Sequence, residues 1–343
     1  MVKKWRLNQD RDVVYQLSEL YGTSSEELSP VKGGLVNVIY EFKKNGKWYI
    51  LRVSTHKTRQ EIQSELEWIL FLHENGVSVS KPVPSIQNNL IETVQYQKRE
   101  FYCVSYKKAI GKSLLKDAES LDLSLWNEDL WINLGRTMGK LHEITKKYTP
   151  KSSLTKYKHI DDNPIFNEDG FSGQPRLKTK LSDLSKKILS LPRPKNAFGL
   201  VHNDINLWNF VLSKDALILF DFDDCGYNWY IHDITTTIHL ISTYILSSGQ
   251  YSSFHQFIRA FWRGYNAECS LNSYWISLIP LFLRFRLFHD YFLFNRMYMQ
   301  EEFDPEDMGF FSHIINDLEK RIYTDRPFID LPVEIWLQLA DST

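Results

Sequence analysis

Residues 200 to 224 bring side chains that bind metals and accept protons next to two short apolar runs. The segment reads LVHNDINLWNFVLSKDALILFDFDD, and its runs FVL and ALILFDF are typical of strands. We predict a hairpin with its turn around Asp215, which places Asn209 across from Asp221 because each lies six residues from that centre. Two oxygen-bearing side chains would then meet at the open end of the hairpin.

Two more polar residues, His202 and Asp204, lie on the loop just before the first of these strands. Amide and carboxylate oxygens suit Mg²⁺, which usually takes one or two protein ligands and completes its octahedron with water and phosphate oxygens. The second carboxylate stays free to accept a proton. A hard cation beside a carboxylate base is the combination that phosphoryl transfer requires.

A second hairpin is predicted nearer the N-terminus, in VNVIYEFKKNGKWYILRVS. Its two alternating runs flank Asn45-Gly46, the strongest short-range signal for a two-residue turn. Counting outward from this turn pairs Ile39 with Arg52, and the face that they share with Ile50 sets an arginine beside two aliphatic residues. The other face carries large apolar side chains: Val38, Tyr40, Phe42, Tyr49, Leu51 and Val53.

A helix is predicted to begin after Thr58, which has capping-box spacing to Glu61, and to end near Gly76. Glu65 lies beside the apolar stripe of this helix. Its side chain can be drawn toward the hairpin sheet or can face solvent.

The segment FYCVSY at 101–106 is typical of a buried strand, and residues 107–111 follow it as a connector. Beyond the connector, DLWINLGRTMGKLHEI begins a series of long amphipathic helices. We therefore expect an N-terminal nucleotide-binding lobe of residues 1–107 and a C-terminal catalytic and substrate-binding lobe of residues 108–343.

The order His-x-Asp-x4-Asn, then a strand pair and Asp-Phe-Asp, resembles the catalytic and metal-binding loops of the kinase superfamily. HNDINLWN and LFDFDDCGYNWYIHD look like the aminoglycoside phosphotransferase and choline kinase branch, which includes homoserine and methylthioribose kinases. The resemblance implies that Asp204 is the catalytic base, that Asn209 and Asp221 hold Mg²⁺, and that His202 braces the loop. It also implies a bilobal α+β protein-kinase-like fold, with a small antiparallel-sheet N-terminal lobe and a larger, mostly helical C-terminal lobe.

The resemblance extends through most of the chain. Gly33 and Gly34 fall where the family's loop covers the phosphates, and Glu65 falls where its helix supplies a partner for a basic strand residue. That basic residue is normally a lysine, and here the aligned position is Arg52, whose guanidinium forks onto a phosphate or a carboxylate.

The connector SYKKAIG resembles the segment between the lobes of the family. The resemblance implies that the backbone at Lys107 and Ala109 bonds the adenine edge of ATP. The nucleotide should lie between the lobes, with Ile39 and Ile50 against the base.

Several charged residues admit two interpretations. Asp223 and Asp224 add a metal ligand or a substrate contact, or they form a hydrogen-bonded turn, and Asp233 is an N-cap or has a structural role. The cationic residues of the aromatic-rich segment contact an anionic substrate or, as we favour, pair structurally: Arg284, Arg286 and His289. The acidic run EEFDPED at 301–307 is an exposed loop or a patch that collects a cationic substrate.

Composition excludes several classes of protein. The chain has 343 residues, of which 43% are hydrophobic, and its formal net charge of -1 gives no field to attract nucleic acid or an anionic membrane. Its three cysteines form no CxxC pair, which predicts neither a disulfide framework nor a zinc site and favours the cytoplasm. No secretory signal is readable, and charged residues interrupt YWISLIPLFLRFRLFHDYFLF, which predicts a buried helix rather than a membrane span. Nothing in the sequence indicates an oligomeric state.

We therefore predict an ATP-dependent, Mg²⁺-assisted kinase that phosphorylates a hydroxyl of a small molecule, such as an amino alcohol, a sugar or an aminoglycoside. Eleven residues separate Asp221 from Asp233, fewer than a protein kinase normally needs to support a peptide. The alternatives are a nucleotide-binding pseudokinase scaffold, a kinase acting on protein Ser or Thr, and a metal-dependent hydrolase that uses DFDD.

Overall fold

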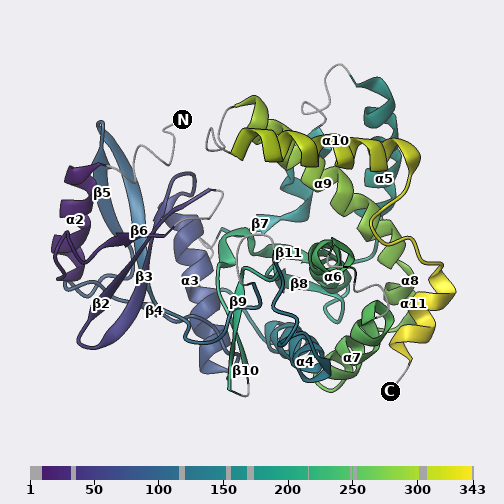
Figure 1. Cartoon of the computed structure of the whole chain (residues 1–343), viewed down its shortest axis with the longest axis horizontal. Coiled ribbons are helices and arrows are strands. Elements are labelled where there is room, and N and C mark those ends of the chain that lie inside the picture. The colour runs from purple at the N-terminus through teal and green to yellow at the C-terminus, as the bar shows by residue number, and fades with distance from the viewer. Residues whose placement is uncertain are drawn as a thin grey trace.

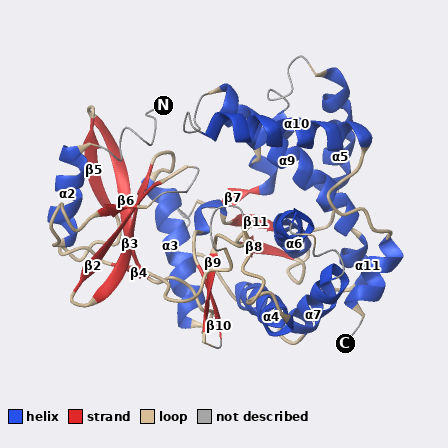
Figure 2. Ribbon diagram, in the orientation of Figure 1, coloured by secondary structure: helices blue, strands red, loops and turns tan. Residues whose placement is uncertain are grey.

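The computed structural model describes residues 10–31, 36–115, 120–151, 156–167, 174–214, 216–247, 249, 253–300 and 307–341. A small lobe built on an antiparallel sheet lies beside a larger, mostly helical lobe (Figures 1 and 2). This is the bilobal α+β arrangement that the sequence predicts.

The sheet of the small lobe has the strand order β1-β2-β3-β6-β4, and β5 also pairs with β6. Every pairing within it is antiparallel. Its strands are β1 (Ser29–Pro30), β2 (Val38–Lys44), β3 (Lys47–Ser54), β4 (Pro82–Val83), β5 (Glu92–Tyr96) and β6 (Arg99–Lys107).

The β2–β3 hairpin has the predicted register, because Ile39 pairs with Arg52. Asn45 and Gly46 have φ angles of 51° and 75°, the positive values that a two-residue type I′ turn needs at both central positions. One face packs on helix α2 (Arg11–Tyr21) in an apolar cluster: Val38, Tyr40, Phe42, Leu51 and Val53 with Val13 and Leu17.

Helix α3 (Arg59–Glu74) covers the other face of this sheet. Its start is the predicted capping box: Glu61 N–H donates to Thr58 Oγ1 at 3.3 Å, and Thr58 N–H donates to Glu61 Oε2 at 2.9 Å. The apolar side chains of α3 enter the core, and Glu65 lies among them with 1% of its surface exposed. The solvent-facing alternative for Glu65 is therefore wrong.

The large lobe consists mainly of helices, with α4 and α7 packed tightly together. A Cβ atom at Gly135 of α4 would lie 1.9 Å from Phe261 O, and one at Gly264 of α7 would lie 2.0 Å from Ile132 O. Glycine is required at both positions because the two backbones touch. The helices are α4 (Glu128–Thr145), α5 (Pro175–Leu189), α6 (Tyr230–Ser247), α7 (Phe254–Asn266), α8 (Ser273–Ser277), α9 (Ile279–Met299), α10 (Met308–Thr324) and α11 (Val333–Ala340).

The polar stretch found in the sequence forms the predicted hairpin, from β9 (Phe210–Ser213) and β10 (Ala216–Leu219). Its register differs by one residue from the prediction. Ser213 pairs with Ala216, so Asn209 lies opposite Phe220, whose N–H donates to Asn209 O at 3.0 Å, and Asp221 follows. The turn is therefore shorter than predicted, with Lys214 at φ 22°, while Asp215 lies outside the described residues.

A three-stranded sheet positions the loop before this hairpin. Its central strand β11 (Gly226–Trp229) pairs with β7 (Lys158–His159) and β8 (Phe198–Val201), and β8 leads directly into His202.

The aromatic-rich run at 274–294 is divided between α8 and α9 and is largely buried. Among the described residues, no helix has both the length and the apolar character needed to cross a membrane.

Candidate active site

The loop after β8 is held by a buried carboxylate, Asp233 of α6. Its two oxygens accept the N–H groups of Asn203 at 2.7 Å and of His202 at 3.3 Å. Asn203 is left-handed, with φ 66°, a conformation that non-glycine residues keep only where neighbours fix it. Asp233 lies inside α6, which begins at Tyr230, so its predicted N-cap role is wrong and its role is structural.

His142 of α4 supports Asp233 from behind. Its Nε2 lies 3.0 Å from Asp233 Oδ2, and its Nδ1 lies 2.9 Å from the hydroxyl of Tyr265. The ring stacks on Tyr230 with a centroid distance of 4.5 Å. His142 is therefore a hydrogen-bonded core residue.

His202 connects the loop to the end of the hairpin. Its Nδ1 accepts the N–H of Asp204 at 3.3 Å, so its Nε2 is the protonated nitrogen and donates to Phe220 O at 3.0 Å. Burial lowers the pKa of this histidine, which keeps the ring neutral. These contacts are those of a brace.

Asp204 and Asn209 are in direct contact. The amide nitrogen of Asn209 donates to Asp204 Oδ2 at 2.7 Å and to Asp204 O at 2.9 Å. The amide oxygen of Asn209 is therefore the atom left for a cation, and the main chain of this residue bonds to Phe220, next to Asp221.

Asp221 ends the β9–β10 hairpin in a left-handed conformation, with φ 61° and ψ 64°. Aspartate tolerates this region better than most residues, and the backbone turn leaves the side chain exposed while Phe222 is buried. An amide oxygen and a carboxylate thus lie at the same end of the hairpin. This donor set suits Mg²⁺, which takes one or two protein ligands and fills its other positions with water and phosphate.

The electrostatics of the site raise the pKa of both carboxyl groups. Loss of hydration, opposed by the guanidinium of Arg286, raises the pKa of Asp204 to about 8. The side chain of Asp221 is exposed, but the protein around it reduces its hydration. This loss of hydration and the negative charge of Asp223 raise the pKa of Asp221 to about 6. A carboxyl group with a pKa near neutrality can take up a proton and release it again.

A buried ion-pair network joins the two lobes at Asp223, two residues after Asp221. Arg52 Nη2 lies 2.8 Å from Glu65 Oε1, and Lys57 Nζ lies 2.6 Å from Glu65 Oε2. Lys57 also reaches Asp223 Oδ1 at 3.1 Å, and Arg52 lies 3.5 Å from the same oxygen. Although burial opposes ionisation, Arg52 and Lys57 hold the pKa of Glu65 below its usual value.

The sequence predicted the Arg52–Glu65 pair but not Lys57, His56 or Tyr106. His56 Nε2 lies 3.2 Å from Asp223 Oδ2, and the Tyr106 hydroxyl donates to Glu65 Oε1 at 3.2 Å. The sequence did contain an indication that Lys57 is paired, because a cation directly before a helix N-cap is repelled by the positive end of the helix dipole. Such a residue is expected to have a carboxylate partner elsewhere.

Asp223 and Asp224 have separate partners. Asp223 belongs to the network of Lys57 and Arg52, and Asp224 Oδ1 lies 2.7 Å from Lys158 Nζ. Both carboxylates are thus paired with protein cations.

The residues expected at the base of the nucleotide lie on one face of the small lobe. Ile39 and Ile50 are half-buried on the face of the sheet that carries Arg52. The Lys107 N–H donates to Lys81 O at 2.8 Å, and its carbonyl accepts Ser80 Oγ at 2.6 Å and keeps a second lone pair. Gly33 and Gly34 lie outside the described residues.

A family model described as the phosphotransferase enzyme family matches residues 27–268. The chain belongs to this family. It is 29% identical over 318 residues to amicoumacin kinase from Bacillus subtilis (strain 168), and the aligned region covers 90% of this chain and 92% of that relative.

Solved structures support the same assignment of this phosphotransferase. An amicoumacin kinase in complex with AMP-PNP, Ca²⁺ and Ami has a TM-score of 0.85 at 27% identity, covering 97% of this chain and 99% of that one. A microcompartment-associated aminopropanol kinase has a TM-score of 0.69 at 20% identity, covering 92% and 98%, and shows the same fold.

The prediction of a kinase from the aminoglycoside phosphotransferase and choline kinase branch, with a bilobal protein-kinase-like fold, is confirmed. The named relatives are small-molecule kinases, which supports ATP-dependent phosphotransfer to a small molecule by this phosphotransferase.

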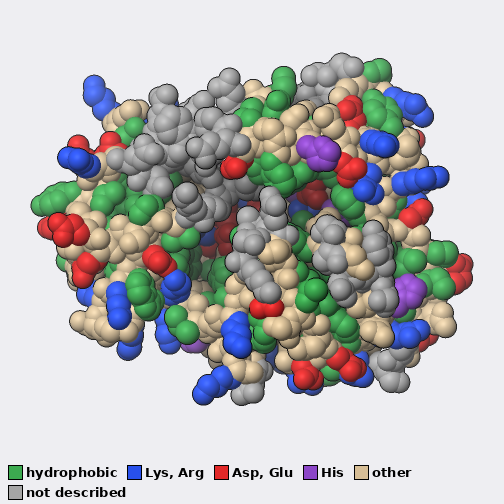
Figure 3. All heavy atoms as spheres, in the orientation of Figure 1, with side chains coloured by type: hydrophobic (Ala, Val, Ile, Leu, Met, Phe, Trp, Pro, Cys, Tyr) green, Lys and Arg blue, Asp and Glu red, His purple; other side chains and the backbone are tan. Residues whose placement is uncertain are grey.

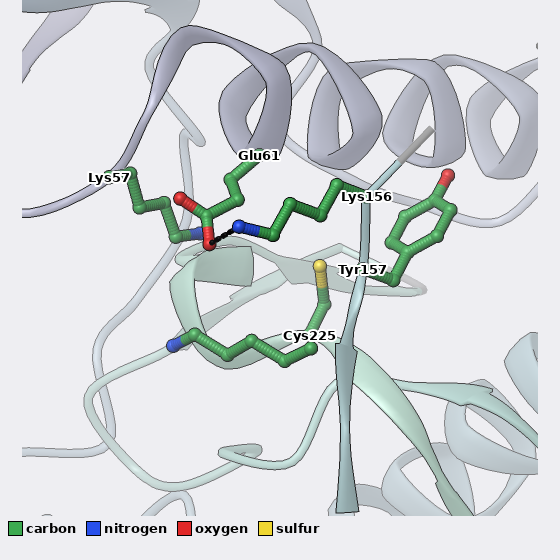
Figure 4. Close-up of a pocket in the computed structure, with 6 residues that line it drawn as sticks. Lys57, Glu61, Lys156, Tyr157 and Cys225 are labelled. Carbon is green, nitrogen blue, oxygen red and sulfur yellow. Dashed lines mark ion pairs between the residues drawn. The ribbon is translucent and has the colours of Figure 1, made fainter. Parts of the chain in front are cut away.

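A small pocket lies behind the ion-pair network of the phosphotransferase, beside the start of α3 (Figure 4). Each of its three lysines lies within ion-pair distance of a carboxylate. The partner of Lys156 is Glu61, at 3.7 Å. Burial raises the pKa of the Cys225 thiol to about 12, so it stays protonated. The pocket is lined by Lys57, Glu61, Lys156, Tyr157, Lys158 and Cys225.

Proposed function

We propose that this phosphotransferase moves the γ-phosphoryl group of ATP to a hydroxyl of a small molecule, with Asp204 as the general base. The observation that carries the proposal is the contact of Asn209 with Asp204 at the end of one hairpin, where Asp221 directly follows the main-chain partner of Asn209 and His202 holds the loop. Residues 1–107 would form the nucleotide-binding lobe and residues 108–343 the catalytic lobe.

The reaction follows from the chemistry of these groups. The Asp204 carboxylate orients the acceptor hydroxyl and takes its proton as the oxygen attacks the γ-phosphorus. The bond between the γ-phosphorus and its bridging oxygen breaks, and ADP leaves with the electron pair. Asn209 and Asp221 would hold Mg²⁺, which offsets the charge on the phosphates when bound.

On the nucleotide side, Arg52 would contribute its charge to the phosphates while Glu65 fixes its orientation. Ile39 and Ile50 would contact the adenine, and the carbonyl of Lys107 and the N–H of Ala109 would bond its edge. That N–H donates to no described residue, which leaves it available.

A small acceptor fits better than a peptide. Between Asp221 and the start of α6 lie only the short helical turn Phe222–Asp224, Cys225 and strand β11. Ion pairs with Lys57 and Lys158 hold the turn, and pairing with β8 holds the strand. This segment has no length left over to support a peptide substrate.

The test is ATP consumption with Mg²⁺ against a panel of acceptors, with amicoumacin first and then amino alcohols, sugars and aminoglycosides. We expect at least one acceptor to be phosphorylated. Asp204→Asn should lower the rate roughly 10²- to 10⁴-fold. Asp183→Asn, an exposed aspartate of α5, is the matched control and should leave the rate unchanged.

Full activity of Asp204→Asn would contradict its role as the base. ATP binding without transfer to any acceptor would favour a scaffold, and phosphate release from esters without a nucleotide would favour a hydrolase.

A further inference from the structure

A second group of buried charged residues lies between α6 and α9, in the large lobe. Arg286 Nη2 lies 2.7 Å from Asp290 Oδ1, and His239 Nε2 lies 3.1 Å from Asp290 Oδ2. Arg286 and Asp290 are exposed over only 8% and 4% of their surfaces. Both oxygens of the carboxylate are thus already paired with basic side chains.

This group keeps polar atoms without partners. Arg286 Nε and His239 Nδ1 are buried and have no hydrogen-bond partner in the part of the chain that the structure describes, whereas His289 Nδ1 lies 3.6 Å from Asp290 Oδ1. A buried donor that is left unpaired is costly, and folded proteins retain few of them without a reason. An unpaired guanidinium N–H is suited to an oxygen acceptor that arrives with a ligand.

Contacts between side chains connect this group to the proposed base. Asn228 Nδ2 donates to Asn203 Oδ1 at 3.1 Å and lies 3.0 Å from His232 Nδ1. The His232 ring contacts Phe282 and Phe285 of α9, each at a centroid distance of 5.7 Å. Asn203 directly precedes Asp204, so the chain of contacts runs from the base to α9.

Arg286 belongs to the face of α9 that makes these contacts. Positions 282, 285, 286 and 289 follow the spacing of residues that share one side of a helix. Arg286 is also the nearby charge that most strongly opposes the raised pKa of Asp204. In the space-filling view the surface is hollowed between the lobes and below α10, with acidic and basic side chains on the floor (Figure 3).

We propose that Arg286 is a specificity-determining residue whose guanidinium binds a carboxylate or carboxamide oxygen of the acceptor, next to the hydroxyl that is phosphorylated. This inference rests on the proposed function and names the chemical class of its substrate. An acceptor that carries only an ammonium group finds no comparable partner here, because Arg286 and His239 already pair with Asp290.

Arg284 does not share this role. It lies two residues earlier on α9 and pairs with Asp325 at 3.2 Å, where both side chains are partly exposed. It therefore offers a matched control on the same helix.

The experiment compares three acceptors that carry the same amine and hydroxyl: isoserine, isoserinamide and 1-amino-2-propanol. They differ only in whether a carboxylate, a carboxamide or a methyl group adjoins the hydroxyl-bearing carbon. We expect kcat/KM to be about 10- to 100-fold higher for isoserine or isoserinamide than for 1-amino-2-propanol, the range of one hydrogen bond to a charged group.

Arg286→Met should abolish this preference, mainly through KM, and Arg284→Met should keep it. Since Arg286→Met also removes a buried ion pair, Arg286→Lys is the second variant: it keeps the charge opposite Asp290 and removes the unpaired Nε–H. Melting temperatures confirm that each variant is folded, and the result for Arg286→Lys decides if Arg286→Met does not fold.

Equal rates with all three acceptors, or an unchanged preference in both Arg286 variants, would overturn the inference and leave the proposed function standing. Failure of every acceptor, including amicoumacin, to receive phosphate from ATP would overturn the proposed function itself.

Discussion

At the scale of single residues, the two polar atoms of the Asn209 amide have different roles. Its nitrogen holds the Asp204 carboxylate at 2.7 Å, and its oxygen is left for the proposed cation. A carboxylate at position 209 would place a like charge against Asp204 and raise its pKa further. The amide is therefore suited to joining the proposed base to the proposed metal site.

Some residues of the proposed site could be selected from the sequence because their chemistry limits the residue type. Asp204, Asn209 and Asp221 would combine proton acceptance with hard oxygen donation, and their spacing was readable along one strand pair. Lys57 was missed because its partners, Glu65 and Asp223, come from different parts of the chain.

Removing Lys57 tests the ion-pair network. Lys57→Met leaves Glu65 with Arg52 as its remaining ion-pair partner and frees one side of Asp223, so we expect a loss of about 2 kcal/mol in the free energy of unfolding. Urea denaturation measures this loss. Lys156→Met removes an exposed lysine that lies 3.7 Å from Glu61 and should cost under about 1 kcal/mol. Equal losses for the two variants would show that burial adds nothing to the Lys57 pairs.

At the scale of elements, the two hairpins differ in how well their register could be predicted. Asn45-Gly46 accepts positive φ at both positions and fixes the β2–β3 turn. The β9–β10 turn has no such pair, since the segment SKD fits loops of two or three residues, and the register was predicted one residue off. The pairing of Ser213 with Ala216 depends on contacts outside the turn, such as the bonds of Leu219 with Ser78 and Ser80.

The close contact between α4 and α7 predicts that a larger side chain at Gly135 destabilises the protein. Gly135→Ala places a methyl group 1.9 Å from Phe261 O, so the helices must separate, and we expect a loss of about 3 kcal/mol in the free energy of unfolding. Gly309→Ala is the matched control, because a Cβ there meets nothing within 4 Å and alanine favours the helix. Chemical denaturation of both variants measures the difference, and a Gly135→Ala protein as stable as the control would contradict the close packing.

At the scale of the whole molecule, contacts between described residues join the lobes near the site. Ser80 N–H donates to Leu219 O at 2.8 Å, and Lys57 reaches Asp223 at 3.1 Å. Both contacts end on the hairpin that carries Asn209 and Asp221 or directly after it. Composition could exclude partner classes but could not give this placement, because the contacts link residues far apart in the sequence.

Nucleotide binding between the lobes should therefore stabilise the whole protein. Mg²⁺ with AMP-PNP at about 100 times its Kd should add about 2.7 kcal/mol to the free energy of unfolding. Thermal unfolding measures the shift, which EDTA should reduce. Asp221→Asn should weaken the Mg²⁺-dependent part while Asp183→Asn keeps it, and an Mg²⁺-dependent shift of full size in Asp221→Asn would exclude this residue as a ligand.

Whether Asp204 acts as the base of a small-molecule kinase is tested most directly by single-turnover transfer from γ-labelled ATP and Mg²⁺ to an acceptor from the panel, by the unaltered protein and by Asp204→Asn. We expect a labelled phosphate ester, formed roughly 10² to 10⁴ times more slowly by Asp204→Asn at unchanged AMP-PNP affinity. Transfer by Asp204→Asn at the rate of the unaltered protein would show that Asp204 is not the base.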